Sequence, residues 1–440
     1  METEELYGLY RGCGCKVTTD SRAIAGGEMF FALRGENFDG NAFAAQALRQ
    51  GAAWAVVNED APVPDEAPVA DRMIRVKDPF RSMQQLAIHH RNTVRGGKLP
   101  VIGLTGTNGK TTTKELVSAV LSAKYRVSAT RGNLNNDIGV PLSLLSITPE
   151  TEIAVIEMGA NHPDDIAKLV RVSQPDYGLI TNVGKAHLLG FGSFEGVKAA
   201  KGELYRWLGG REGSVIFLDM DSADLVGMAA SVPSHVFGYG VRYQGAEILP
   251  ATAASPFMRL RLDGDVVETR LVGAYNASNV LAAIAVGTYF GVPRKDALAA
   301  LAAYVPTNNR SQMLDTGRNT VIVDAYNANP SSMAVALDNL ALMQADAKLA
   351  LLGGMRELGA DSVREHKAVV DRLSSHGIRA FLVGDEFSEV LKDGAPSCIL
   401  GWFPDSEALA KHLSEHPVRG ATVLLKGSRG IQMEKVLPTI

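Results

Sequence analysis

One short segment combines the residue types that bind and transfer phosphate groups. Thr105-Gly-Thr-Asn-Gly-Lys-Thr-Thr112 directly follows the apolar run 100–104 and leads into a helical pattern. In a strand, loop and helix of this kind, the loop N–H groups and the helix N-terminus point at a polyphosphate. Lys110 would reach the outer phosphates, and the Thr111 hydroxyl would bind Mg²⁺. The predicted nucleotide site comprises Gly106, Thr107, Asn108, Gly109, Lys110, Thr111 and Thr112.

This segment departs from the general pattern G-x-x-x-x-G-K-[ST] at its first glycine. That glycine should fall at position 104, where the chain has Leu104, and glycines stand instead at 103 and 106. A glycine-rich loop without any ligand is the alternative interpretation. The Lys-Thr pair and the strand and helix on either side favour nucleotide binding.

Two further polar residues follow predicted strands of the same region. The strand 153–156 runs straight into Glu157, and the strand 177–181 leads into a glycine-rich loop that carries His187. Ligands of open α/β sheets bind at the carboxyl ends of the strands. Glu157 is therefore either a Mg²⁺ ligand or a solvated surface residue, and His187 either a ligand or active-site residue or a structural one.

Lys201 occupies an unexpected position in the predicted helix 195–208. It shares one helix face with three apolar residues, Val197, Leu204 and Leu208. An unpaired buried ammonium is costly, so Lys201 must extend to solvent, pair with a carboxylate or lose its charge. A neutral amine can take up CO₂ to form a carbamate, which binds metal as a carboxylate does. Lys198 lies on another face and is expected to be an ordinary solvated lysine.

The composition is that of a globular enzyme of two or three domains. The chain has 440 residues and a net charge of −4, with 46% hydrophobic and 21% charged residues. No basic patch indicates nucleic acid, and no apolar run approaches the ~20 residues that span a bilayer. The acidic N-terminus lacks a signal-peptide pattern, so we expect a cytoplasmic protein, a monomer, that acts on small molecules. Cys13 and Cys15 are expected to be reduced thiols, since no second pair completes a zinc site.

The pattern of elements predicts an α/β fold in three segments. In the first, short strands are expected at 28–33, 53–57 and 73–76, with a helix at 42–49. In the second, strands at 101–104, 127–130, 153–158, 177–181 and 214–218 alternate with helices, which indicates a parallel sheet. An antiparallel patch at 246–271 and a helix at 276–290 follow. A second alternation has strands at 320–324, 349–353, 380–384, 397–400 and 422–426.

The motifs taken in order resemble the Mur ligases of peptidoglycan synthesis over the whole chain. Besides the loop 105–111, the matching motifs are Asn135-Asn-Asp-Ile-Gly-Val-Pro141, Glu157-Met-Gly159, Asn182 with His187, Ala199-Ala-Lys201, Tyr275-Asn-Ala-Ser-Asn279, Arg310, Asp324-Ala-Tyr-Asn-Ala-Asn-Pro330, Glu357-Leu-Gly359, His366 and Lys426-Gly-Ser-Arg429. Within the family, the chain resembles the branch whose amine substrate is D-Ala-D-Ala. The features that indicate this are the segment 324–330 and the absence of an Asp-Asn-Pro-Arg motif.

The resemblance implies a fold of three domains and an ATP-dependent amide ligation. The domains would be a small mixed α/β UDP-binding domain at 1–80, a central ATP-binding domain with a mostly parallel sheet at 81–311, and a Rossmann-like, doubly wound domain at 312–440. ATP would phosphorylate the carboxylate of a UDP-linked muramoyl tripeptide, and the amine of D-Ala-D-Ala would attack the acyl phosphate. Folylpolyglutamate synthase and an ATP-gated regulatory protein are the alternatives. The N-terminal segment disfavours the first, and intact Lys110, His187 and Lys201 disfavour the second.

The resemblance also implies a role for each candidate residue. Lys110, His187 and Lys201 would be catalytic; Thr111 with Glu157 would hold one Mg²⁺, and His187 with carbamylated Lys201 a second. Asn276 and Arg310 would position the adenine side and Asp324 the ribose or phosphate region of ATP. The UDP group would be held by Ser21, Arg22, Leu33, Gly35 and Asn37. The acceptor region would contain Asn327, Asn329 and Ser332.

Overall fold

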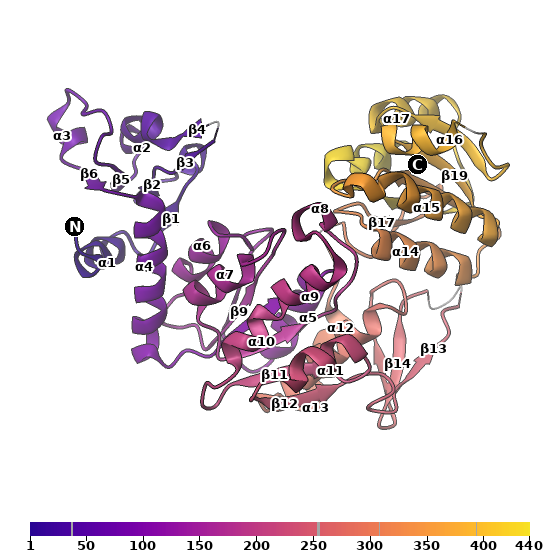
Figure 1. Ribbon diagram of the computed structural model, residues 1–440, viewed down its shortest axis with the longest axis horizontal. Coiled ribbons are helices and arrows are strands. Elements are labelled where there is room, and N and C mark those ends of the chain that lie inside the picture. Colours follow the sequence, from indigo (N-terminus) through magenta and orange to yellow (C-terminus); the bar gives the residue numbers. More distant parts are fainter. Residues whose placement is uncertain (37, 253–255, 308, 393) are drawn as a thin grey trace.

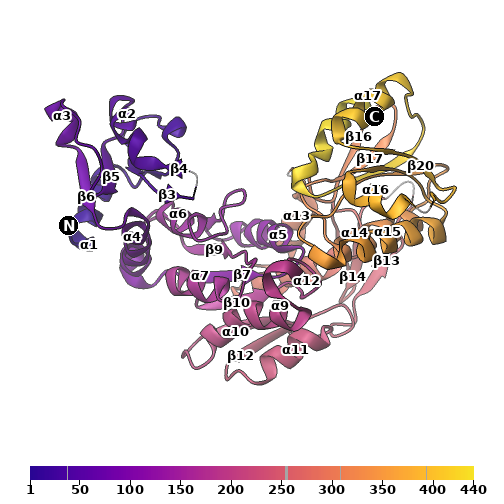
Figure 2. The same ribbon diagram turned by 45° about the horizontal axis from the view of Figure 1, so that its top comes forward.

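Three α/β units follow one another along the chain in a computed structural model that describes residues 1–36, 38–252, 256–307, 309–392 and 394–440 (Figure 1). Residue 37, expected in the UDP site, lies outside the described residues. Figures 1 and 2 show the first and third units at opposite ends of the central one. Within the described ranges, no helix is long and apolar enough to cross a membrane.

The first unit contains a four-stranded parallel sheet with the strand order β1-β2-β5-β6. Its strands are β1 (Val17–Thr18), β2 (Met29–Phe31), β5 (Trp54–Asn58) and β6 (Met73–Val76), and a short hairpin is made by β3 (Arg34–Gly35) and β4 (Phe38–Asp39). Its helices are α1 (Thr3–Gly12), α2 (Ala44–Arg49) and α3 (Ala67–Ala70), with 3₁₀ turns η1 (Ser21–Ala23) and η2 (Gly40–Phe43). The three predicted strands and the predicted helix of this unit are confirmed.

Helix α4 (Pro79–Thr93) connects the first unit to the central one. The Asp78 side chain accepts a hydrogen bond from the Arg81 N–H, and Pro79 occupies the first turn, so the sequence specifies where this helix begins. Its buried face packs against α1 on one side and against α6 and α7 of the central unit on the other. The predicted domain boundary after residue 80 falls at the start of this shared helix and stays a prediction.

The central unit is built on a six-stranded parallel sheet with the order β12-β11-β10-β7-β9-β8. The strands are β7 (Val101–Thr105), β8 (Val127–Ala129), β9 (Ile153–Glu157), β10 (Tyr177–Ile180), β11 (Val215–Asp219) and β12 (His235–Tyr239). The helices are α5 (Lys110–Ser122), α6 (Gly139–Leu145), α7 (Asp165–Ser173), α8 (Leu188–Phe191), α9 (Phe194–Lys201), α10 (Glu203–Leu208), α11 (Ala223–Ala230), α12 (Asn276–Tyr289) and α13 (Arg294–Ala303), with a 3₁₀ turn η3 (Val94–Gly97) after α4. β12 was not predicted; it is an edge strand whose first residues are exposed, so it lacks an apolar run.

The antiparallel patch is confirmed as a three-stranded sheet beside the central unit. Its strands are β13 (Glu247–Leu249), β14 (Arg259–Leu262) and β15 (Asp265–Glu268). Residues 253–255 of the predicted patch lie outside the described residues. The inward positions Leu260, Leu262 and Val267 are buried and alternate with exposed ones, as a half-solvated antiparallel sheet requires.

The third unit is a six-stranded sheet with the order β16-β17-β21-β18-β19-β20. Its strands are β16 (Gln312–Asp315), β17 (Thr320–Asp324), β18 (Lys348–Gly353), β19 (Arg379–Val383), β20 (Ile399–Phe403) and β21 (Thr422–Lys426). Its helices are α14 (Pro330–Leu342), α15 (Ser362–His376), α16 (Asp385–Leu391) and α17 (Ser406–Glu415), with 3₁₀ turns η4 (Gly359–Asp361), η5 (Arg429–Ile431) and η6 (Met433–Thr439). The unpredicted β16 pairs antiparallel with β17 at one edge, and the other pairs are parallel.

Buried apolar strands explain why both large sheets are sandwiched between helices. Every residue of β7 and β9 is buried, including the polar residues at their carboxyl ends. Strands of this kind need helices on both faces, which is the α/β arrangement predicted from the sequence. Since β7 lies between β10 and β9, the chain segments that follow these three strands meet at one edge.

The predicted helix 195–208 is divided at one residue. α9 ends at Lys201 and α10 begins at Glu203, with Gly202 between them. Glycine has a low helix propensity, which allows the break. The predicted apolar face survives the break, because Lys201 is 2% exposed and the three apolar residues that share its face are fully buried.

Candidate functional site

The loop after β7 is held rigidly by the end of β10. Asn182 accepts the N–H of Asn108 at 2.9 Å through Oδ1 and donates to its carbonyl at 3.0 Å through Nδ2. The Thr181 hydroxyl donates to the same carbonyl at 2.6 Å, and the N–H of Thr107 donates to the Asn182 carbonyl at 2.9 Å. These bonds leave the N-terminus of α5 open toward the cavity, where it can receive an anion.

Two glycines are required in this loop by their backbone angles and their neighbours. Gly106 has φ +148°, and a Cβ there would lie 1.9 Å from the Thr181 hydroxyl oxygen. Gly109 has φ +76°, and a Cβ there would lie 2.8 Å from Asn279 Oδ1. Leu104, where the general pattern has glycine, is instead a fully buried residue of β7. The altered glycine spacing is thus compatible with a tightly folded phosphate loop.

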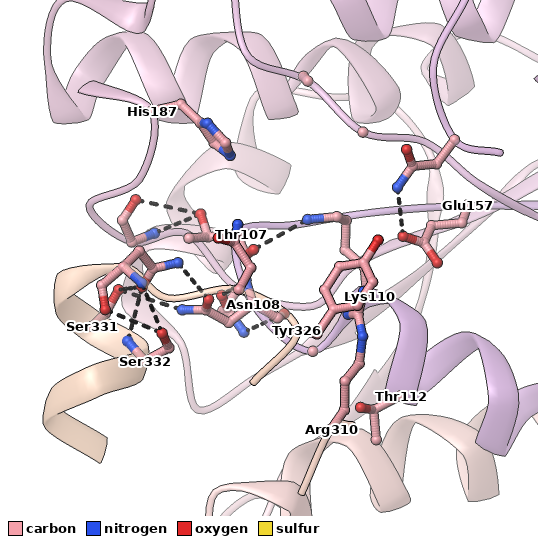
Figure 3. Close-up of a pocket in the computed structure, with 18 of the residues that line it drawn as sticks. Thr107, Asn108, Lys110, Thr112, Glu157, His187, Arg310, Tyr326, Ser331 and Ser332 are labelled. Atoms are coloured by element: carbon pink, nitrogen blue, oxygen red, sulfur yellow. Dashed lines mark hydrogen bonds between the residues drawn. The ribbon is translucent and has the colours of Figure 1, made fainter. Parts of the chain in front are cut away.

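Lys110 is the first residue of α5, and its side chain folds back over the loop. Its Nζ donates to the carbonyls of Gly106 at 2.8 Å and Thr107 at 3.1 Å (Figure 3). Burial lowers the pKa of Lys110, opposed by the Glu157 carboxylate and reinforced by Arg310. A cation held in this position faces the space above the helix N-terminus, where the outer phosphates of a nucleotide would lie.

Thr111 and Glu157 form a buried pair of oxygen donors beside Lys110. The Thr111 hydroxyl donates to both carboxylate oxygens of Glu157, at 2.9 and 3.2 Å, and Asn135 Nδ2 donates to Oε1 at 2.8 Å. Glu157 is 1% exposed and forms no ion pair with any residue that the structure describes. A buried carboxylate without a cationic side-chain partner, next to a hydroxyl, is a donor set that fits Mg²⁺.

Lys201 lies beneath the cavity, as its helix face predicts. Its Nζ is 5.7 Å from the centre of the Phe191 ring, and no hydrogen bond or ion pair joins it to another residue within the described ranges. Burial, reinforced by Lys110, lowers the pKa of Lys201 to about 7. As an ammonium it would not bind a metal ion; with His187 it fits one only after conversion to a carbamate. No group of three or more His, Cys, Asp or Glu side chains able to hold a metal occurs among the described residues.

The third unit meets the phosphate loop through the N-terminus of α14. Asn329 Nδ2 donates to Asn108 Oδ1 at 2.7 Å, and Asn108 Nδ2 lies 3.4 Å from the Ser331 hydroxyl. Asn329 is also the N-cap of α14, because its Oδ1 accepts the Ser332 N–H at 2.9 Å. One side chain therefore both begins this helix and connects it to the phosphate loop.

Asn329→Ser should separate these two functions. Serine retains an oxygen that caps the helix but lacks the amide N–H that reaches Asn108, so the thermal midpoint should change little. Loss of one interdomain hydrogen bond, typically worth ~1 kcal/mol, should lower kcat/KM about fivefold. Asn339→Ser, which alters a helix asparagine on the same element, is the control. Unchanged kcat/KM in Asn329→Ser would contradict a contribution of this contact to turnover.

Arg310 and Asp324 lie on the third-unit side of the same cavity. The Arg310 guanidinium stacks on the Tyr326 ring at 3.7 Å, and its Nε is buried without a hydrogen-bond partner in the described part of the chain. Asp324 Oδ2 accepts a 2.5 Å hydrogen bond from Lys426 Nζ, which is 2% exposed. Arg310 stands between two non-glycine residues in left-handed conformation, Asn309 (φ +55°) and Ser311 (φ +49°). The backbone strain there is of the kind found at functional positions.

Asn276 lies at the start of α12 with most of its amide already bonded. Its Nδ2 donates to the Val272 carbonyl at 2.8 Å, and its Oδ1 accepts from Asn279 at 2.9 Å. Asn279 in turn accepts the Thr113 hydroxyl at 3.0 Å. Asn276 therefore connects α12 to the nucleotide helix α5 through Asn279.

One cavity of about 700 Å³ joins most of the predicted site residues. The predicted residues that line it are Thr107, Asn108, Gly109, Lys110, Thr112, Glu157, His187, Asn276, Arg310, Asp324, Asn327, Asn329 and Ser332. Three of the predicted residues do not line the cavity. Gly106 lies in the loop, the Thr111 hydroxyl is bonded to Glu157, and Lys201 is buried. A volume of this size is that of a small-molecule site.

The residues predicted to hold UDP lie apart from this cavity, on the first unit. Ser21 and Arg22 are in η1, where Arg22 makes a bidentate ion pair with Asp20 at 2.8 and 2.9 Å. Leu33 is 9% exposed, and Gly35 lies in the exposed hairpin. The four described residues therefore gather on one unit but do not form part of the central cavity.

Several residues that shape the cavity were not among the predicted site residues. Asn135 orients Glu157, Tyr326 stacks on Arg310, and Lys426 pairs with Asp324. Each belongs to a motif quoted from the sequence, so a signal was present. Their partners became clear only from the folded structure, because each pair joins segments that are distant in sequence.

A buried histidine supports the loop that follows β18. His366 Nε2 accepts the N–H of Met355 at 2.8 Å, while Nδ1 bonds the Ser362 carbonyl at 2.7 Å. The ring is fully buried against Phe387, and burial lowers the pKa of His366. The loop depends on neutral His366, because a protonated ring cannot accept the Met355 hydrogen bond.

The third unit should therefore lose stability in mild acid. The folded pKa of His366 lies below its unfolded value, so the contribution is complete above the unfolded value near ~6.5 and is lost as the pH falls below it. His366→Gln, which can retain the acceptor without titrating, should show a smaller fall of the urea midpoint between about pH 7.5 and about pH 5.5. Equal falls in both proteins would contradict this assignment.

Comparisons with known proteins agree along the whole chain. Three family models match: "Mur ligase family, catalytic domain" at residues 16–91, "Mur ligase middle domain" at 104–287 and "Mur ligase, glutamate ligase domain" at 309–429. The chain is 33% identical to UDP-N-acetylmuramoyl-tripeptide–D-alanyl-D-alanine ligase of Bacillus subtilis (strain 168), over 96% of this chain and 92% of that protein.

Two solved structures share this fold. A crystal structure of MurF from Acinetobacter baumannii has a TM-score of 0.81 and 31% identity, covering 96% of this chain and 92% of that one. MurF ligase from Thermotoga maritima in complex with ADP has a TM-score of 0.81 and 27% identity, covering 96% of each chain.

Proposed function

This chain belongs to the Mur ligase family, and we propose that it is the ATP-dependent ligase that joins D-Ala-D-Ala to UDP-N-acetylmuramoyl-tripeptide in peptidoglycan precursor synthesis. The observation that carries the proposal is the single cavity between the phosphate loop and the α14 segment. A nucleotide bound on one side would there face an acceptor and an amine on the other. ADP in the Thermotoga maritima relative supports ATP as the nucleotide.

The reaction proceeds in two chemical steps. A carboxylate is a poor electrophile, so its oxygen first attacks the γ-phosphorus of ATP, and the bond from that phosphorus to the bridging oxygen breaks to release ADP. The dipeptide amine then attacks the acyl carbon, loses a proton, and phosphate leaves from a tetrahedral intermediate. Lys110 stabilises the negative charge that develops on the transferred phosphoryl group.

The remaining site residues hold the reactants in place. Thr111 and Glu157 would hold one Mg²⁺, and His187 with a Lys201 carbamate a second; magnesium neutralises phosphate charge. Asn276 and Arg310 would lie on the adenine side, and Asp324 on the ribose or phosphate side. Asn327, Asn329 and Ser332 would face the acceptor, while Ser21, Arg22, Leu33, Gly35 and Asn37 would hold UDP.

The Lys201 carbamate forms by a balanced reaction of the neutral amine. The Nζ lone pair adds to the carbon of CO₂, and a proton is released to solvent. A pKa near 7 leaves much of Lys201 neutral at cytoplasmic pH, which supports this assignment. A cytoplasmic monomer with domains at 1–80, 81–311 and 312–440 completes the proposal.

The choice of amine substrate tests the function directly. D-Ala-D-Ala should be ligated to UDP-muramoyl tripeptide, whereas D-Ala alone should be used at least ~10-fold less well, because an unmade hydrogen bond in such a site costs ~1–3 kcal/mol. The measurement compares kcat/KM for D-Ala-D-Ala, D-Ala, L-Lys and meso-diaminopimelate with matched UDP-linked acceptors. Ligation of L-Lys or diaminopimelate to a dipeptide precursor, with none of D-Ala-D-Ala, would move the chain to another branch.

A further inference from the structure

Glu357 is a carboxylate of the third unit that contacts His187, a residue that lines the cavity. It lies in the loop between β18 and η4, and it contacts His187 Nδ1 of the central unit. Its side chain is 55% exposed, and His187 is its one ion-pair partner among the described residues. The structure therefore presents an acidic group, without a lysine or arginine partner, next to the predicted catalytic residues.

Both partners of this contact have a strained backbone. His187 has φ +50° and Glu357 φ +64°, conformations that non-glycine residues seldom adopt. Strain of this kind persists where the surrounding structure imposes it and gathers at functional positions. Because the two strained residues belong to different units and contact each other, the structures of both units determine this contact.

The loop that carries Glu357 is fixed by hydrogen bonds on both sides. The Met355 N–H donates to His366, and the Arg356 N–H donates to the Ser428 hydroxyl at 2.9 Å. The Arg356 side chain turns away and pairs with Glu386 at 3.2 Å. The neighbouring cation therefore does not pair with the Glu357 carboxylate.

The charges near His187 create a problem for the incoming substrate. An α-amino group has a pKa of ~8, so the dipeptide arrives mostly as an ammonium. The Lys110 ammonium lies near His187 and would repel that cation. The Glu157 carboxylate, which lines the cavity, is already bonded by Thr111 and Asn135. Asp324 pairs with Lys426.

We propose that Glu357 binds the ammonium group of the incoming dipeptide and so places the amine beside the acyl phosphate. The inference rests on the proposed function. The ammonium replaces the His187 ring as the partner of the carboxylate; it then releases a proton to solvent, which frees the nitrogen lone pair to attack the acyl carbon. Glu357 is thus a binding residue for the amine substrate, supplied only when the third unit lies against the central one.

Glu357→Gln tests this assignment because it keeps the shape and removes the charge. The side chain is half exposed, so folding should be unaffected. A hydrogen bond to a charged group contributes ~1.5–3 kcal/mol, so the KM for D-Ala-D-Ala should rise at least ~10-fold. The KM values for ATP and for UDP-muramoyl tripeptide should stay within about twofold.

A second readout isolates the step before amine binding. Hydroxylamine is neutral at pH 7; its nitrogen attacks the acyl carbon, phosphate leaves, and a hydroxamate forms. Glu357→Gln should make hydroxamate from ATP and the tripeptide at the unmodified rate. Glu389→Gln, a surface carboxylate of α16 that pairs with Lys392, is the matched control and should change neither readout.

Three outcomes would count against these assignments in different ways. An unchanged KM for D-Ala-D-Ala in Glu357→Gln would overturn the inference. An equal loss of hydroxamate would overturn it as well, because Glu357 would then act on phosphoryl transfer, for example as a metal ligand. If the unmodified protein made neither product, the proposed function itself would fail, and the inference with it.

Discussion

Lys110→Ala is expected to reduce ATP-dependent ligation by at least ~100-fold in a protein that still folds, because one preorganised cation at a developing charge is worth a few kcal/mol. The Lys110 ammonium is held over the phosphate loop by the carbonyls of Gly106 and Thr107. Its removal deletes positive charge where the transferred phosphoryl group would lie. The protein should remain folded, because burial already opposes the charged form of this side chain.

The measurement is phosphate release dependent on the tripeptide acceptor and D-Ala-D-Ala. Lys110→Met, which keeps most of the side-chain volume, should lose activity to the same extent and so exclude a packing effect. Lys98→Ala, an exposed lysine ahead of β7, is the control for a change of net charge. Turnover near that of the unmodified protein in Lys110→Met would rule out the phosphoryl-transfer role.

Lys201→Ala should lose nearly all ligase activity, by about 100-fold to 1000-fold. The reason is the position of its amine, which is buried beneath the cavity without a hydrogen bond or ion pair to any described residue, and whose pKa is lowered to about 7. As the pH rises through that value the neutral amine accumulates, and only this form reacts with CO₂. A carbamate would give this position a negative charge that the unmodified lysine cannot supply.

Chemical rescue distinguishes a carbamate from a structural lysine. Formate or acetate should restore part of the activity of Lys201→Ala by filling the position of the missing carboxylate. Lys198→Ala is the matched control from the same helix, since Lys198 pairs with Glu195 and Asp224 at the surface. Experimental density that showed a plain ammonium paired with Asp or Glu, in an enzyme competent for turnover, would exclude the carbamate.

The sequence predicted the parts of the fold that depend on local pattern. The run 101–112 specified a strand, a loop and a helix, and the apolar face that carries Lys201 was read from spacing alone. The alternation of strands and helices predicted both large α/β sheets. Two of the strands that were missed, β12 and β16, lie at sheet edges, where partial exposure removes the apolar run on which such a prediction depends.

The site was predictable as a set of residues but not as a set of contacts. Asn329 was expected near the acceptor, yet its bond to Asn108 joins residues 221 positions apart and depends on how the third unit docks. The contact of Glu357 with His187 spans 170 positions and could not be inferred from either motif. Pairings of this kind are set by the placement of whole units, which local sequence patterns do not report.

The predicted UDP site lies on the first unit, apart from the central cavity. The distance between these two sites would therefore select the length of the acceptor substrate. The uridine end of the substrate would be held on the first unit, while the carboxylate at the other end of the substrate must reach the phosphate loop of the central unit (Figure 2). One amino acid changes the reach of an extended peptide by ~3.3–3.6 Å, more than the tolerance of a reacting geometry. A dipeptide precursor would stop short of the γ-phosphate and a pentapeptide would overshoot it. On this arrangement, the distance between the two sites would select the length of the acceptor peptide without a pocket for each side chain.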